Sequence, residues 1–347
     1  MSTTDEVQPP QPGAAGRTPT GSRRPAAAGR RLLVYAVTVW AMVTVVFLLP
    51  RAVPGDPLGY YDNGLDSPLS PEYRAALAAR YHLDQPLVSQ YRSYVGQLLH
   101  GDLGESITAR EPVTRLIRQR LPWTLLLVGT SLAVSSAVGF AAGVSAAWRR
   151  GGPTDRRLLT AMTVLHGVPE YALAVLVLLV LAARVPLFPA VGAYTPYMDS
   201  SGPVDKAVDV AYHLVLPALA LSLGLVGTKF LLVRNTTVSV LGQEYMLLAR
   251  AKGLSERRLK YRHASRNVLL PFVTVLGLQV AFAAGGSLFV ETVFGYPGLA
   301  SLMLPAVQDL DFPLLEGCFL MLALLVLTVN LLLDLVYVRL DPRVGAE

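Results

Sequence analysis

Six long apolar runs separated by polar segments dominate the pattern along this chain. They lie near residues 32–50, 121–148, 158–183, 212–233, 268–290 and 314–337. About 20 apolar residues, rising about 1.5 Å each along a helix, cross the roughly 30 Å hydrocarbon layer of a bilayer. The pattern therefore predicts an all-α, polytopic membrane protein with six transmembrane helices.

The composition agrees with that prediction. Of the 347 residues, 52% are apolar and only 16% are charged, whereas water-soluble domains carry about a quarter charged residues. The single cysteine, Cys318 in the sixth span, excludes an internal disulfide and a metal cluster built on cysteines.

The distribution of Lys and Arg predicts the orientation. With the N-terminus inside, 19 of the 30 basic residues lie in cytoplasmic segments and ten in external ones, as the positive-inside rule favours. The remaining one, Lys229, lies in the fourth span, and we expect its ammonium to reach the cytoplasmic interface while its stem lies along lipid. This excess of basic residues on one membrane face requires no nucleic-acid partner.

The chain ends and one external segment complete the domain organisation. Residues 1–30, rich in Pro, Gly, Ala, Ser and Thr without periodicity, predict a disordered cytoplasmic tail, and 341–347 predict a short cytoplasmic C-terminal tail. Between them, 31–340 form the transmembrane domain. Its external segment, 52–120, contains a helix start at Ser70 and an amphipathic stretch over 87–99, which we expect to fold over the outer mouth of the protein.

A basic segment at 234–267, between the fourth and fifth spans, predicts a helix, a sharp turn and a second helix. Good helix formers occupy 243–252, and Gly253 is placed to end that helix in a left-handed conformation, with Leu254 packing back on Ala249. Ser255 is placed to cap the second helix through its hydroxyl. The first helix is too apolar for a merely solvated loop, so we expect it to meet a partner on that side of the membrane.

Several short motifs, in order and at matching spacing, resemble one family of membrane proteins. They are Leu49-Pro50 with Pro54-Gly55-Asp56-Pro57, Leu83-Asp84-Gln85-Pro86, Gly101-Asp102-Leu103-Gly104-Glu105-Ser106, Ala249-Arg250-Ala251-Lys252-Gly253-Leu254, Arg266-Asn267 with Leu270-Pro271, Glu291-Thr292-Val293-Phe294 with Pro297-Gly298-Leu299, and Asn330 to Asp334 with Asp341-Pro342-Arg343. Over about 31–344 the chain is similar to the B-type inner-membrane permease of the dipeptide and oligopeptide (peptide/nickel) branch of ABC importers.

The resemblance implies a type I ABC importer permease fold in a bacterial inner membrane and a coupling role for 234–267. The implied partners are a second homologous permease, two cytoplasmic ABC ATPases, an extracytoplasmic substrate-binding protein, a peptide substrate and membrane lipid. The coupling residues so implied are Glu244, Tyr245, Met246, Leu248, Ala249, Arg250, Ala251, Lys252, Gly253 and Leu254. Among them we expect Tyr245, Met246, Leu248 and Leu254 to anchor the ATPase, and Arg250 and Lys252 to meet acidic groups at its rim.

One departure concerns the acid of the general Glu-Ala-Ala motif. Residues 247–249 read Leu-Leu-Ala, so Glu244 does not simply inherit that role.

Other function classes receive less support. No Gly-x-x-x-x-Gly-Lys-Ser/Thr loop occurs, and none of the lysines follows a glycine, so the chain is expected not to be an enzyme or to hold a nucleotide, cofactor or metal. An ion-coupled secondary transporter stays open as a rival class, as do nickel, suggested by His166 and His213, glutathione and other small solutes as cargo.

Glu170 and a few polar groups in or beside the spans complete the candidates. Glu170 follows Pro169 near the expected mid-depth of the third span, where the related permeases carry a small or polar residue. It either lines the pathway or makes a structural hydrogen bond, because an intramembrane charge is costly. Glu291 and Asn330 with Asp334 are expected to form interfacial or interhelical hydrogen bonds.

Overall fold

The computed structural model describes residues 24–59, 70–185, 187–196 and 202–340. The chain forms two compact units, 1–45 and 46–347, and everything below concerns the second unit except the start of α1 (Arg24–Arg51). Residues 1–23 and 341–347, which carry most of the predicted tails, lie outside the described residues. The prediction of a disordered tail as far as residue 30 was wrong, since 24–30 belong to α1.

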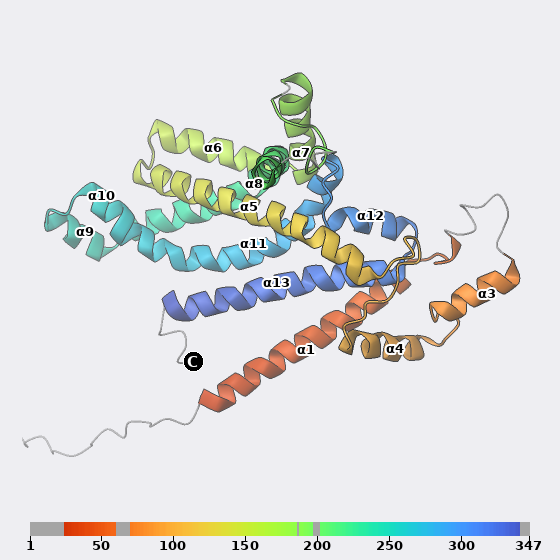
Figure 1. Ribbon diagram of the computed structural model, residues 1–347. Helices are drawn as coiled ribbons and strands as arrows, with labels where there is room; N and C mark the ends of the chain where they lie inside the picture. Colours follow the sequence, from red (N-terminus) through yellow and green to blue (C-terminus); the bar gives the residue numbers. More distant parts are fainter. Residues whose placement is uncertain (1–23, 60–69, 186, 197–201, 341–347) are drawn as a thin grey trace, which may run out of the picture. The chain divides into compact units, whose positions relative to one another are not determined.

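The described elements are all helical and follow one another with short connections (Figure 1). After α1 they are α3 (Pro71–Arg80), α4 (Leu87–Leu99), α5 (Val113–Trp148), α6 (Pro153–Gly167), α7 (Glu170–Leu178), the π-helix η1 (Leu179–Arg184), α8 (Pro203–Leu241), α9 (Glu244–Ala251), α10 (Glu256–Arg258), the π-helix η2 (Leu259–Ala264), α11 (Ser265–Val293), α12 (Ala300–Gln308) and α13 (Phe312–Leu340).

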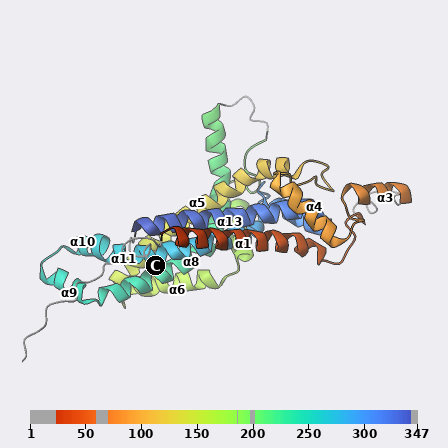
Figure 2. The same ribbon diagram turned by 90° about the horizontal axis from the view of Figure 1, so that it is seen from below.

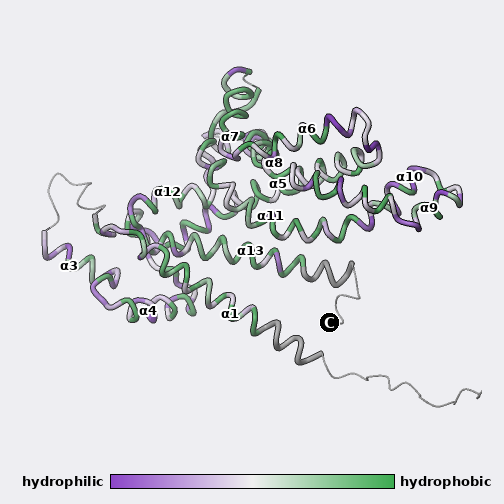
Figure 3. Tube along the Cα trace, turned by 180° about the vertical axis from the view of Figure 1, so that it is seen from behind, coloured by the Kyte–Doolittle hydropathy of each residue, from purple (hydrophilic) through white to green (hydrophobic). Residues whose placement is uncertain are grey.

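Five of the six predicted spans are confirmed as helices long and apolar enough to cross a membrane. They are part of α1, then α5, α8, the continuous run from α10 to α11, and α13. Figure 3 shows hydrophobic residues along much of α5, α11 and α13, and hydrophilic ones concentrated at α3 and α10.

The third predicted span is broken. α6 and α7 are bent by 104° at the break between them, so the span predicted near 158–183 is not one continuous helix, and it makes a sixth span when the bent pair is taken as one. Val168 is extended, with φ −88° and ψ 129°, because the ring of Pro169 clashes with a helical residue before it. Glu170 consequently stands in the first turn of a new helix, and not in the middle of one continuous helix.

α5 and α8 pack closely through a Gly-x-x-x-Gly motif. A Cβ atom built on Gly139 would lie 2.8 Å from Cβ of Lys229, and one on Gly143 would lie 2.8 Å from Cβ of Val233. Small residues let helix backbones approach in a membrane, where van der Waals packing drives association. Ser131 strengthens the pair by donating from Oγ to the Ala218 carbonyl oxygen at 3.3 Å.

Lys229 lies inside this interface, so the prediction that it reaches the lipid interface was wrong. Its side chain is fully buried, and Nζ lies 2.5 Å from Oγ of Ser135 and 3.5 Å from the carbonyl oxygen of Leu132. Both partners belong to α5, which offers the ammonium polar atoms within the bundle that lipid would not supply.

α7, α8 and α11 converge with α5 on the main core, and α13 lies beside α11 in both ribbon views (Figures 1 and 2). The external segment contains the two expected helices. Ser70 caps α3 by accepting a hydrogen bond from Tyr73 N at 3.3 Å. The last predicted external residues, including Arg115, Arg118 and Arg120, belong to α5, which begins at Val113 and continues without interruption into the second span.

Candidate functional site

The predicted turn after the first helix of 234–267 is present at the end of α9. Gly253 has φ +71°, its N–H donates to the Arg250 carbonyl at 2.9 Å, and the N–H of Leu254 donates to the Ala249 carbonyl at 3.3 Å. This pair of bonds is the Schellman arrangement, in which a left-handed residue satisfies carbonyls at a helix end. The turn reverses the chain into α10.

One face of α9 packs on the chain's own helices. Met246 is fully buried and Ala249 is nearly so. They join a small cluster with Val240, Leu259 and Ala264, against which Trp148 and Leu254 pack. α9 is therefore supported by the end of α5 through Trp148 and by η2 at the entry to α11.

The opposite face of α9 is exposed and largely apolar. Tyr245 is 40% exposed, Leu247 is 59% exposed and Leu248 is 57% exposed. Glu244, Ala251 and Gly253, together with Arg250 and Lys252, are exposed as well. The expectation that Met246 anchors a partner was wrong, because its side chain is fully buried on the inner side of α9. Leu254 is partly buried against the same cluster, and its contact with a partner stays a prediction. Leu247, which the sequence reasoning passed over, is the most exposed apolar side chain of the helix.

The second half of the segment differs from the sequence prediction in one detail. Ser255 is the N-cap residue of α10, but its hydroxyl accepts no capping hydrogen bond from the first turn of that helix. α10 is a single turn that continues through the π-helix η2, where Ser265 N bonds to the Lys260 carbonyl, into α11. Lys260 Nζ lies 3.4 Å from Oγ of Ser145, and Asn267 donates to the Tyr245 hydroxyl oxygen, so α5 and α11 both hold the segment.

A buried ion pair fixes the neighbouring loop. Nε and Nη2 of Arg234 lie 2.6 Å and 2.8 Å from the two carboxylate oxygens of Asp155, which also accepts from Gly151 N at 2.9 Å. The paired geometry is the strong bidentate form of an arginine–carboxylate contact. It joins the first turn of α6 to the C-terminal part of α8, the helix that precedes α9. Sequence reasoning missed it because the partners lie 79 residues apart.

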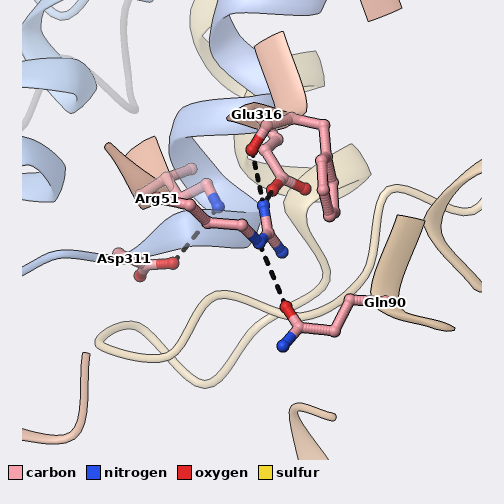
Figure 4. Close-up of polar contacts among 6 residues, drawn as sticks. Arg51, Gln90, Asp311 and Glu316 are labelled. Carbon is pink, nitrogen blue, oxygen red and sulfur yellow. Dashed lines mark hydrogen bonds and ion pairs between the residues drawn. The ribbon is translucent and has the colours of Figure 1, made fainter. Parts of the chain in front are cut away.

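At the other end of the bundle, two acidic residues of the α13 region hold the external segment (Figure 4). Asp311 Oδ2 is fully buried and accepts from Ser106 Oγ at 2.6 Å and Thr108 N at 3.0 Å. Glu316 pairs with Arg51, whose Nε donates to Oε1 of Gln90 at 3.0 Å.

The surroundings of Arg51 are partly aromatic. Its guanidinium carbon lies 3.6 Å from the Phe47 ring centroid. Beside this cluster is a cavity of about 160 Å³ lined in part by Tyr94. Burial raises the pKa of Tyr94, so its phenol stays protonated. The Gly101–Ser106 motif thus has a structural role, in that it supplies Ser106 to Asp311.

Glu291 organises the connection between α11 and α12. Its Oε1 accepts from Thr124 Oγ1 at 2.8 Å, and its Oε2 accepts from Ser301 N at 2.9 Å. A Cβ atom on Gly298 would lie 2.2 Å from the Glu291 carboxylate, so glycine leaves room for that acid. The expectation of a hydrogen-bonding role for Glu291 is confirmed. Asp334 lies outside the residues whose side chains are described, and Asn330 packs with Oδ1 near Gly277.

Glu170 lies where α7, α8 and α11 meet. A Cβ atom on Gly286 of α11 would lie 1.9 Å from its Oε2, and one on Gly224 of α8 would lie 3.0 Å from its Cγ. The side chain is half-buried. Among the described residues no hydrogen bond or ion pair engages its carboxylate. The structural hydrogen bond considered for Glu170 is therefore not found in that part of the chain.

Comparison with known proteins identifies the family. Residues 139–346 match the family described as binding-protein-dependent transport system inner membrane component. The chain is 35% identical over 315 residues to a putative peptide permease protein of Brucella ovis, covering 90% of this chain and 97% of that protein. It is 32% identical over 331 residues to the dipeptide transport system permease protein DppB of Escherichia coli K12, covering 91% of this chain and 97% of that protein.

Two further similarities agree with this family assignment. A glutathione transport system permease protein of Escherichia coli O6:H1 is 34% identical, with 91% of this chain and 97% of that protein covered. A chain of the MetNI methionine ABC transporter in an inward-facing conformation matches the fold with a TM-score of 0.51 at 15% identity, covering 66% of this chain and 97% of that one. The chain is thus a multi-pass membrane protein that belongs to the family of binding-protein-dependent transport system inner membrane components.

Proposed function

We propose that this chain is one of two permease subunits in an ATP-driven importer of dipeptides and oligopeptides. Its partners are a second homologous permease, two cytoplasmic ABC ATPases and an extracytoplasmic substrate-binding protein. Support comes from the family match and from relatives named as peptide and dipeptide permeases.

The observation that carries the coupling role is the two-sided character of α9. One side is anchored in the chain's own core through Met246, while the other exposes Tyr245, Leu247 and Leu248. A short helix held rigidly on one side and apolar on the other is suited to docking in a groove, with Arg250 and Lys252 at the rim.

The proposed mechanism follows from what α9 touches. Closure of the two ATPases on ATP displaces α9, and the displacement passes to α5 through Trp148 and to α11 through Leu259 and Ala264. Because packed cores switch between discrete arrangements and do not deform continuously, the spans follow as rigid segments and change the side on which the pathway opens.

Cross-linking tests the docking directly. Cys318 is buried, so Leu248→Cys adds the single accessible thiol of the described chain. In the assembled transporter we expect a cross-link from this thiol to an ATPase, and none from a matched thiol introduced by Arg92→Cys on α4. Labelling by a membrane-impermeant maleimide should place the two thiols on opposite sides of the membrane. A cross-link from α4, or labelling of both thiols from the same side, contradicts the proposal.

Transport is tested in proteoliposomes containing all partner subunits. Uptake of a labelled dipeptide should require ATP and both ATPases. Uptake by this chain alone, driven by an ion gradient, would instead establish the rival secondary transporter.

Glutathione, itself a tripeptide, is a second cargo to test because a glutathione permease is among the relatives. Nickel receives less support. Among the described residues, no three His, Cys, Asp or Glu side chains are grouped to hold a metal.

A further inference from the structure

The break between α6 and α7 leaves irregular backbone uncovered by this chain. Val168 and Pro169 are not helical, Gly167 and Pro169 are exposed, and a Cβ atom on Gly167 would meet nothing within 4 Å. Within the hydrocarbon region, non-helical backbone is tolerated only where protein buries it or where it lines a water-filled cavity. Taken as one bent span, α6 with α7 and η1 is long and apolar enough to cross a membrane, and the break then lies within the hydrocarbon region. The exposed side of this break therefore does not face lipid.

The carboxylate of Glu170 leads to the same conclusion independently. It is half-buried at this break, and no hydrogen bond or ion pair joins it to another described residue. A charge exposed to lipid is strongly disfavoured, and intramembrane acids face the bundle interior or water. Because Gly224 and Gly286 lack side chains, they leave room for the carboxylate between α8 and α11.

Exposed aromatic rings occur next to Glu170 in the chain and on α11, the helix that carries Gly286. Tyr171 is 53% exposed and Phe289 is 47% exposed, and their ring centroids lie 6.2 Å apart. Phe282, 69% exposed, lies on the same face of α11 as Gly286 and Phe289, because residues four and seven positions apart share a helix face. A carboxylate and exposed aromatic rings on neighbouring residues together suit an ammonium group, which bonds to the first and is attracted by the second.

We propose that the break between α6 and α7 lines the substrate pathway and that Glu170 accepts a hydrogen bond from the cationic amino group of the solute in transit. This inference rests on the proposed function, in which that group is the free amino terminus of a peptide. The aromatic surface of Tyr171, Phe282 and Phe289 then contacts its apolar side chains. Solutes whose amino group is blocked gain nothing from the carboxylate.

Thiol reactivity tests the site without depending on transport. Tyr171→Cys, in the assembled transporter, should react with a cationic methanethiosulfonate about tenfold faster than with an anionic one of similar size, since hydrogen bonds to charged groups correspond to about tenfold or more. Tyr171→Cys combined with Glu170→Gln should lose that preference. No reaction with either reagent would show that lipid or the second permease covers the break, and an unchanged preference in the double variant would remove Glu170 from the site. Either result overturns the inference.

Uptake supplies the second measurement. With one binding protein used throughout, Glu170→Gln should lower the initial uptake of a subsaturating dipeptide about tenfold, while Glu72→Gln, an exposed acid on α3, should leave it unchanged. If ATP-dependent uptake is intact in Glu170→Gln, the inference fails and the proposed function stands. If the unaltered transporter shows no ATP-dependent uptake, the proposed function fails, and the thiol reactivity still decides whether the break faces water.

Discussion

The turn at Gly253 offers a direct test of how α9 is held. Its φ of +71° lies in the left-handed region, and a Cβ atom added there would meet nothing within 4 Å. A substitution therefore acts through the backbone alone, with no steric contribution from neighbours. For an L-residue the left-handed conformation costs roughly 1–2 kcal/mol. Asparagine tolerates it best, alanine less well, and a β-branched residue such as valine least.

Hydrogen exchange of the segment 244–259 in the purified membrane protein measures this cost. The N–H groups of Gly253 and Leu254 close the turn, and a loss of 1–2 kcal/mol should raise their opening about 5- to 30-fold. We expect exchange to quicken in the order Gly, Asn, Ala, Val at position 253, and the ATPase stimulation of the assembled transporter to fall in the same order. Equal exchange in Gly253→Val and Gly253→Asn would refute the reasoning, because the two differ mainly in their tolerance of this φ.

Three further predictions concern groups inside the bundle. Asp155→Asn and Arg234→Gln should each lower the unfolding free energy by about 3–5 kcal/mol, since each leaves a buried partner unpaired. In thermal unfolding in detergent, the double variant should lose less unfolding free energy than the sum of the two single losses. Lys229→Met should fold and sustain uptake, because a side chain of similar length fills the same space. Gly139→Val should fail to assemble, because its Cβ would lie 2.8 Å from Cβ of Lys229 and 3.3 Å from Phe230 N. Size-exclusion chromatography distinguishes the two variants, and a monodisperse Gly139→Val protein would contradict the close packing of α5 on α8. Asp311→Ala removes an acceptor used by Ser106 and Thr108. Limited proteolysis should then cleave residues 101–111 at a rate several-fold higher, and an unchanged cleavage rate would show that other contacts hold this loop.

Apolar length predicted the five unbroken spans because each rests on local composition alone. The break in the third span has a cause that composition does not contain. Pro169 ends α6, whereas Pro50, Pro122, Pro217 and Pro271 each lie inside a continuous helix. The presence of a proline therefore does not by itself predict the break.

In the candidate site too, features set by neighbouring residues were predicted, and features set by contacts between distant helices were not. The left-handed turn at Gly253 and the helix before it follow from residues next to one another, so the sequence predicted them. Which side of α9 faces inward depends on Trp148, Leu259 and Ala264, and it places Met246 inside and leaves Leu247, for which no role was predicted, exposed. The burial of Lys229 and the pairing of Asp155 with Arg234 depend on contacts between helices distant in the sequence, for which no local signal exists.

The fit of Glu291 above Gly298 has an evolutionary consequence. Because the carboxylate occupies the volume that any side chain at position 298 would need, the two positions are not free to change separately. A lineage that gains an alanine at 298 displaces the acid at 291 from Thr124 and Ser301 unless that acid is also shortened, and a descendant with a shorter residue at 291 is released from the need for glycine. Substitutions at these two sites should consequently appear together among homologous sequences.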